Sequence, residues 1–161
     1  MEESEMREIM FRGKCTDGGA WVCGKGIDAN FSDAYILQGW MDCDTGTCEV
    51  DEIEVVPETV GQYTGLTDIN GKKIFEGDII KAYFEPQNFK NPNYAIGSVI
   101  FENGTFKVVV HVSKKSIEYK VFEKEEITAY SIEHNFLDRY YVLEVIGNIH
   151  DDPELLMRAV E

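Results

Sequence analysis

Basic side chains are scarce in this chain. Its 161 residues include 15 Lys or Arg against 30 Asp or Glu, so the formal net charge is -15 at pH 7. A protein this acidic repels a phosphate backbone and offers few cations to displace the counterions around it. We therefore do not expect direct binding to nucleic acid.

Long apolar runs are absent as well. No uninterrupted apolar segment approaches the roughly 20 residues that span a bilayer. The acidic start Met1-Glu2-Glu3-Ser4-Glu5 lacks the basic-then-apolar order of a secretion signal. We expect a cytoplasmic protein with no membrane segment, in which Cys15, Cys23, Cys43 and Cys48 are reduced thiols.

Motifs for catalysis or cofactor binding are also missing. Gly24-Lys25-Gly26 and Asp17-Gly18-Gly19 lack the spacing of a phosphate-binding loop, and no nucleophile elbow is present. Four cysteines and three histidines raise the question of zinc, but only Cys43 and Cys48, with four residues between them, approach the spacing of a zinc knuckle. We expect no cofactor, no metal site and no enzyme activity.

Linkers rich in Ser, Pro or Gly are not found either. The length suits one domain, or one domain with a subdomain, and the apolar fraction of 43% is ordinary for a globular protein. We expect a disordered leader over residues 1–5, an N-terminal β subdomain over 6–61, and the main body of the protein over 62–161.

Alternating charged and apolar residues predict strands in the first third. Residues 8–13 place Ile9 and Phe11 on one strand face, and Asp17-Gly18-Gly19 predicts a hairpin to a second strand with Trp21 in the core. The first third is therefore predicted to be a β-meander. Its further strands are expected at 34–41, 47–50 and 53–56, with a turn at Asp44-Thr45-Gly46.

The rest of the chain carries stronger turn signals. Asn70-Gly71 and Glu76-Gly77-Asp78 predict tight turns before a buried strand at 79–84, and Asn103-Gly104 predicts a hairpin between strands at 97–101 and 105–112. A mobile loop is expected over 85–94 and a strand over 141–149. Asp152 followed by Pro153 predicts a terminal helix of about two turns. Within 113–140, residues 118–122 alternate like a strand, while the pattern over 123–137 mixes helical and extended signals and predicts neither.

An acidic stretch is the one candidate interaction surface. Seven carboxylates and no basic residue lie between residues 42 and 58, and we single out six of them. An exposed, solvated sheet face is one interpretation, a hard-cation site is another, and a phosphate-mimicking surface that occupies a DNA-binding partner is a third. The six residues are Asp42, Asp44, Glu49, Asp51, Glu52 and Glu54.

Several segments, in order along nearly the whole chain, resemble the YopX family of phage- and prophage-encoded proteins. They are Met6-Arg7-Glu8-Ile9-Met10-Phe11-Arg12, Gln62-Tyr63-Thr64-Gly65-Leu66-Thr67-Asp68 with Asn70-Gly71-Lys72, Ile74-Phe75-Glu76-Gly77-Asp78-Ile79-Ile80, Gly97-Ser98-Val99, and Val145-Ile146-Gly147-Asn148-Ile149 with Asp152-Pro153-Glu154-Leu155-Leu156. The resemblance implies a mainly β protein with a small SH3-like barrel and no established activity.

Together these observations predict a mainly β fold, in which an N-terminal β-meander leads into a small SH3-like barrel closed by a short C-terminal helix. As a function we expect an accessory protein that binds a host or phage protein and forms a homo-oligomer. The alternative is an acidic DNA mimic or a metal-dependent regulator. That alternative needs the carboxylates of 42–58 on one contiguous surface.

Overall fold

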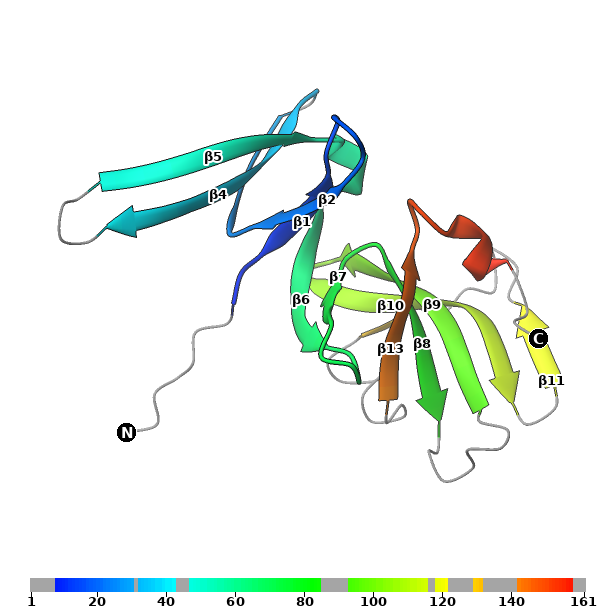
Figure 1. Ribbon diagram of the computed structural model, residues 1–161. Coiled ribbons are helices and arrows are strands. Elements are labelled where there is room, and N and C mark those ends of the chain that lie inside the picture. Colours follow the sequence, from blue (N-terminus) through cyan, green and yellow to red (C-terminus); the bar gives the residue numbers. More distant parts are fainter. Residues whose placement is uncertain are drawn as a thin grey trace, which may run out of the picture. The chain divides into compact units, whose positions relative to one another are not determined.

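The computed structural model describes residues 8–30, 32–42, 47–84, 93–115, 118–121, 129–131 and 142–157. The expected leader, the turn at 44–46, residues 85–92 of the loop expected at 85–94 and most of 113–140 lie outside the described residues. Residues 93 and 94 of that expected loop form the start of a strand instead. The elements are β1 (Phe11–Lys14), β2 (Trp21–Gly24), β3 (Gly26–Ala29), β4 (Ala34–Asp42), β5 (Thr47–Val55), η1 (Pro57–Thr59), β6 (Gly61–Thr67), β7 (Lys73–Phe75), β8 (Asp78–Phe84), β9 (Asn93–Glu102), β10 (Thr105–Lys115), β11 (Glu118–Val121), β12 (Ala129–Ser131), β13 (Val142–Asn148) and η3 (Pro153–Leu156) (Figure 1).

The fold is mainly β, as the alternating sequence pattern predicted, and it divides into two compact units, Met1–Gly65 and Leu66–Glu161. The boundary falls inside β6. The strand orders are β2-β1-β6-β7, β3-β4-β5, and β11-β10-β9-β8-β13 with β12 paired to β10. No helix among the described residues has the length and apolar character needed to cross a membrane.

The first unit packs a hairpin against a three-stranded sheet. The predicted turn at 17–19 joins β1 to β2, with Gly18 and Gly19 at φ of 79° and 68°. Ala34, Ile36 and Val55 are buried beneath it. Gly13 allows this approach, because a Cβ there would lie 2.8 Å from the Val55 side chain. The core of this unit is therefore small and depends on close packing of backbone against side chain.

Two details of the first unit differ from the sequence-based prediction. The first strand begins at Phe11 rather than at residue 8, and Ile9 is 55% exposed. Trp21 is only half-buried, and the guanidinium of Arg12 lies 4.8 Å from the centre of its ring. An indole whose face carries a cation can remain partly in water, because the ring's negative face attracts the charge.

The second unit is built on a bent sheet (Figure 1). Its hairpin turn at Asn103-Gly104 was predicted, and both residues adopt positive φ, 53° and 79°. One face of the sheet carries the larger core cluster, which includes Ile80, Val99 and Val108. The other face carries Ile79, Tyr94 and Ile96, against which Leu155 and Leu156 pack. Both faces of these central strands are therefore buried in part.

Buried carboxylates join the turns of the second unit. Asp68 accepts hydrogen bonds from the backbone N–H groups of Asn70 and Lys72, both 2.8 Å, and closes the predicted turn. Asp78 is 1% exposed and accepts bonds from the Phe75 N–H, 2.8 Å, and from Asn148 Nδ2, 3.4 Å. Asp68 and Asp78 therefore stabilise the fold through these hydrogen bonds.

The last described residues differ from the predicted two-turn helix. Pro153 to Leu156 form one short 3-10 turn within the described residues. Asp152 makes no capping bond to this turn, because its Oδ2 accepts a hydrogen bond of 3.3 Å from the N–H of Asn148 instead. The carboxylate that would cap an α-helix thus serves the network around Asp78.

Candidate interaction surface

The acidic stretch lies on the antiparallel ribbon formed by β4 and β5 (Figure 1). Its register runs without a shift from the pair Asp42 and Thr47 to the pair Ala34 and Val55. At Gly39 the two strands come so close that a Cβ would collide with the backbone of Glu49. The absence of a side chain at Gly39 therefore permits the regular pairing of the ribbon.

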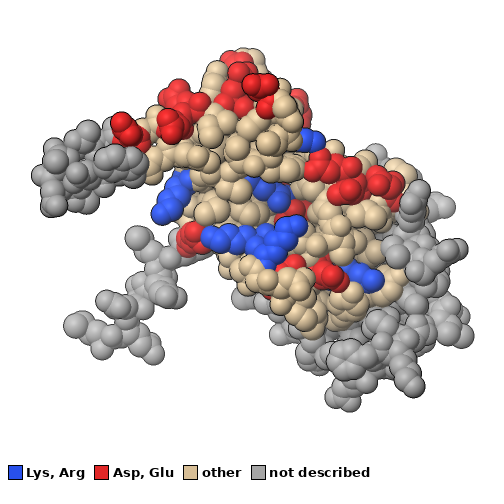
Figure 2. Space-filling model, in the orientation of Figure 1, with Lys and Arg blue, Asp and Glu red and all other residues tan. Residues whose placement is uncertain are grey.

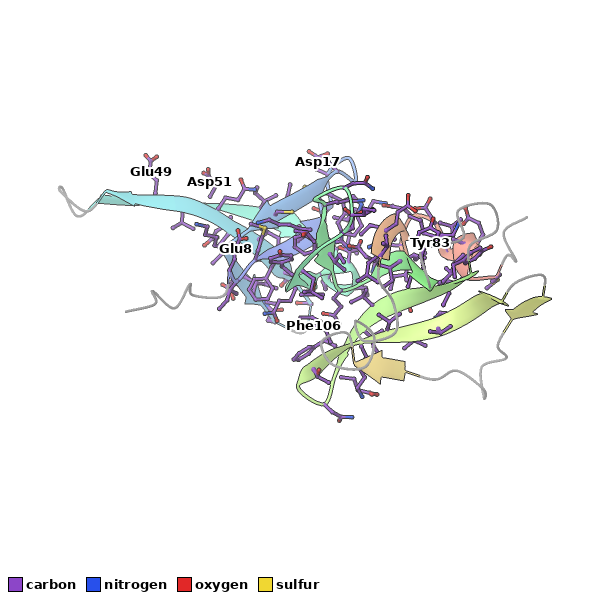
Figure 3. All side chains as sticks on the ribbon, turned by 90° about the horizontal axis from the view of Figure 1, so that it is seen from below. Glu8, Asp17, Glu49, Asp51, Tyr83 and Phe106 are labelled. Atoms are coloured by element: carbon purple, nitrogen blue, oxygen red, sulfur yellow. The ribbon has the colours of Figure 1, made fainter. Side chains whose placement is uncertain are left out.

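The carboxylates of β5 alternate between the two faces of the ribbon. Glu49 and Asp51 share one face with Ile53 and Val55, and Figure 3 shows Glu49 and Asp51 pointing to the same side. We call this the Val55 face, because Val55 enters the core at its inner end, where it is 1% exposed. Glu52 and Glu54 project from the opposite side, which we call the Tyr35 face.

The structure therefore divides the four predicted residues whose side chains it describes between the two faces. It pairs Glu49 with Asp51 and Glu52 with Glu54. Asp42 is the last residue of β4. Its side chain and all of Asp44 lie outside the described parts. Within the described residues, no three His, Cys, Asp or Glu side chains are arranged to hold a metal ion.

The four acidic side chains of β5 are exposed, and none of them makes a side-chain hydrogen bond or ion pair within the described parts of the chain. Acidic side chains are seen along the upper part of Figure 2, over the unit that contains the ribbon. Carboxylates without intramolecular cations remain available to an external basic group.

Two further acidic residues, Asp28 and Asp33, extend the Tyr35 face. In the register, Asp28 of β3 and Glu54 of β5 lie on either side of Tyr35. The pKa of the Tyr35 phenol is raised above its ordinary value, first by the charge of Glu54, then by burial, and further by Asp33, Glu52 and Asp28. A phenol resists ionisation in this way when negative charges surround it.

Sequence analysis missed Asp28, Asp33 and Tyr35 as parts of this surface. A hairpin centred on the expected turn at 44–46 would have placed Tyr35 opposite Val55, one residue away from the observed pairing with Glu54, so the expected turn did not predict this contact. Asp28 carried no comparable signal, because its strand has four residues and ends in an irregular loop.

The second unit holds two polar contacts that the sequence also did not suggest. Ser98 Oγ and His111 Nε2 lie 3.1 Å apart, and burial lowers the pKa of the His111 imidazole. His111 occupies a β-bulge between Val110 and Val112. A bulge turns a side chain out of the regular alternation, and a regular strand prediction does not anticipate it.

The second contact joins Tyr83 and Glu144. The Tyr83 hydroxyl donates a hydrogen bond of 2.8 Å to Glu144 Oε2. In the same region, the Lys81 ammonium lies 4.2 Å from the centre of the Tyr94 ring. The pKa of Tyr83 is raised to about 12. Burial of the phenol is the largest cause, and the hydrogen bond to Glu144 and its charge add to it. The hydroxyl is therefore a hydrogen-bond donor at neutral pH and no base.

The cysteines do not form a centre in the part of the chain that the structure describes. Cys15 and Cys23 are not joined in a disulfide bond. The side chains of Cys43 and Cys48 lie outside the described parts.

The chain was compared with solved structures, curated proteins and protein-family models. The chain is similar to protein EF1440 from Enterococcus faecalis, with 23% identity and a TM-score of 0.47 over 92% of this chain and 97% of that chain. No curated protein matches. The YopX family model, described as YopX protein, matches residues 10–157. Since that match covers most of the sequence, the chain belongs to the YopX family.

Proposed function

We propose that this protein is a phage or prophage accessory protein that acts in the bacterial cytoplasm by binding another protein through its β4–β5 ribbon. The observation that carries the proposal is the set of exposed β5 carboxylates, Glu49, Asp51, Glu52 and Glu54, without ion-pair partners in the described chain. The partner surface is basic, because opposite potentials attract and favour association.

The ribbon suits a partner that contacts both of its faces better than one that covers a single plane. A DNA mimic must present its carboxylates on one contiguous surface to a DNA-binding groove. Glu49 and Asp51 face away from Glu52 and Glu54, so the alternation of β5 divides the charge between two sides. This arrangement favours a partner segment that lies along the ribbon.

Self-association along β5 is disfavoured by the same charges. Two copies that paired through this strand would bring Glu and Asp side chains opposite one another, and like charges opposite each other destabilise a sheet. The homo-oligomer expected from the sequence remains a proposal and would use a different strand edge.

For the second unit we propose a small SH3-like barrel. Strands β8, β9 and β10 form a meander and β13 returns to pair with β8. The N–H of Ile69, just after β6, also donates a hydrogen bond of 2.9 Å to the carbonyl of Leu143 in β13. A meander that is extended by its last strand, which is bonded in turn to the segment after β6, supports a barrel-like second unit that serves as a scaffold.

Affinity capture from phage-infected cells tests the proposed function. The ribbon variant carries Glu49→Gln, Asp51→Asn, Glu52→Gln and Glu54→Gln. A matched control neutralises four exposed acidic residues elsewhere, Asp17→Asn, Glu58→Gln, Glu102→Gln and Glu154→Gln, so both variants change the net charge equally. We expect the wild type and the control to retain the same basic protein and the ribbon variant to lose it. Equal retention by all three proteins would refute the proposal.

A further inference from the structure

Strand β5 has an open edge. It is the outermost strand in the order β3-β4-β5. Among the described residues, its outer side is bonded at the inner end alone, where Val56 N–H donates to Lys14 O, 2.8 Å, and Thr16 N–H donates to Glu54 O, 3.3 Å. From Thr47 to Ile53 no described strand pairs with this side.

The register fixes which backbone groups this edge offers. In an antiparallel pair, the N–H and C=O groups of successive residues point to opposite sides of the strand. Glu54 and Val56 direct their groups toward β1, away from β4, and the β4–β5 register is continuous. The N–H and C=O groups of Val50 and Glu52 therefore point outward along the open edge.

We propose that a lysine- or arginine-rich extended segment of a partner protein adds to β5 as the next strand. This inference rests on the proposed function and names the class of partner and its mode of binding. In strand addition, main-chain hydrogen bonds hold the ligand on the edge strand, and alternate side chains of the ligand determine the specificity. Charge complementarity identifies the occupant, because β5 exposes carboxylates on both of its faces beside the open edge.

The register also predicts the sequence of an antiparallel ligand. Residues opposite Glu52, Asp51 and Glu49 should be cationic, and the residue opposite Val50, which is 51% exposed, should be apolar. Read along the ligand, this gives two cations, one apolar residue and a third cation. The like charge of β5 itself excludes a second copy of this strand as the occupant.

Peptide binding to the full chain tests the inference at low ionic strength, where screening is weak. The probe is a fluorescein-labelled peptide that contains Lys-Lys-Val-Lys between threonines. Its control has methylated backbone nitrogens at the Val and at the first Lys, which keeps every charge but blocks the ladder. We expect saturable binding of the probe and at least about tenfold weaker binding of the methylated peptide, the size expected for lost main-chain hydrogen bonds.

Two protein variants complete the test. Val50→Pro removes an outward N–H, which an edge strand tolerates, and Val50→Thr keeps it. We expect about a tenfold loss of peptide affinity for Val50→Pro and an unchanged affinity for Val50→Thr. Equal binding of the two peptides, or no saturable binding of the probe, overturns strand addition while the capture experiment still decides the proposed function. If Val50→Pro does not fold, the comparison of the two peptides on the wild-type protein decides between strand addition and simple charge attraction.

Discussion

Asp68 and Val145 are 77 residues apart in the sequence, and the backbone N–H of Val145 donates a hydrogen bond of 3.1 Å to Oδ2 of Asp68. With the bonds from Asn70 and Lys72, this contact ties the turn after β6 to strand β13. Burial of the carboxyl acts to raise the pKa of Asp68, but the hydrogen bonds from Val145, Lys72 and Asn70 outweigh it, and the pKa lies below its ordinary value.

Replacement of Asp68 should destabilise the protein. Asp68→Ala removes three charge-assisted hydrogen bonds, so we expect a loss of about 2 to 3 kcal/mol in the free energy of unfolding. Because the folded-state pKa is depressed, this stability is present above the unfolded pKa of about 3.9 and is lost as the pH falls through the folded value. Urea unfolding as a function of pH measures both effects. Asp17→Asn, at an exposed turn, is the control, and equal stability of the two variants contradicts the account.

Two glycines of the β9–β10 hairpin should respond differently to alanine. A Cβ at Gly97 would lie 2.6 Å from both Val108 Cγ1 and the carbonyl oxygen of Val109, and we expect Gly97→Ala to cost about 3 kcal/mol through overpacking. A Cβ at Gly104 would meet no atom within 4 Å, and only the positive φ disfavours a side chain there. We therefore expect Gly104→Ala to cost about 1 kcal/mol. Denaturant midpoints order the two variants, and the reverse order would show that the hairpin packs differently.

The Tyr83 phenol should ionise at a higher pH than an ordinary tyrosine. We expect its absorbance change at about pH 12, identified by subtraction of a Tyr83→Phe titration, and Glu144→Gln should lower this pKa toward 10. A pKa raised on folding gives stability that is fully present below the unfolded value of about 10 and is lost as the pH rises through the folded value. An unchanged titration in Glu144→Gln would show that the bond between Tyr83 and Glu144 does not form in solution.

His111 should remain neutral below the usual pH range of imidazole. Since burial lowers its pKa, its stabilising contribution is present above the unfolded value of about 6.5 and is lost as the pH falls through the folded value. Proton NMR of the ring resonances, assigned with His111→Gln, reports this titration. We also expect Ser98→Ala to shift the ring resonances of His111 and not those of His150. A midpoint at or above 6.5 contradicts the packing of His111 beside Ser98.

Local signals in the sequence were enough to predict much of the fold. Asn103-Gly104 can adopt positive φ at both positions, and the flanking β-branched residues favour strands, so this hairpin depends on a few neighbouring residues. The turns at Gly77 and at Gly18-Gly19 were predicted for the same reason.

Features that depend on distant contacts were not predictable in this way. The 3-10 turn at Pro153 reflects the hydrogen bond that Asp152 makes with Asn148 instead of a cap. The division of the acidic residues between the Val55 face and the Tyr35 face needed the register of β4 against β5. Similarly, the outward position of Val50 follows from the bonds that Lys14 and Thr16 make at the far end of the strand.

Amide hydrogen exchange tests the central claim, that the β4–β5 ribbon is the interaction surface, most directly. The protein is compared alone and with the partner that wild-type protein retains from infected cells. The outward amides of Val50 and Glu52 should exchange quickly in the free protein and become protected in the complex, while the exchange of β8, β9 and β10 stays unchanged. Protection confined to the second unit, with Val50 and Glu52 still in fast exchange, would contradict the account.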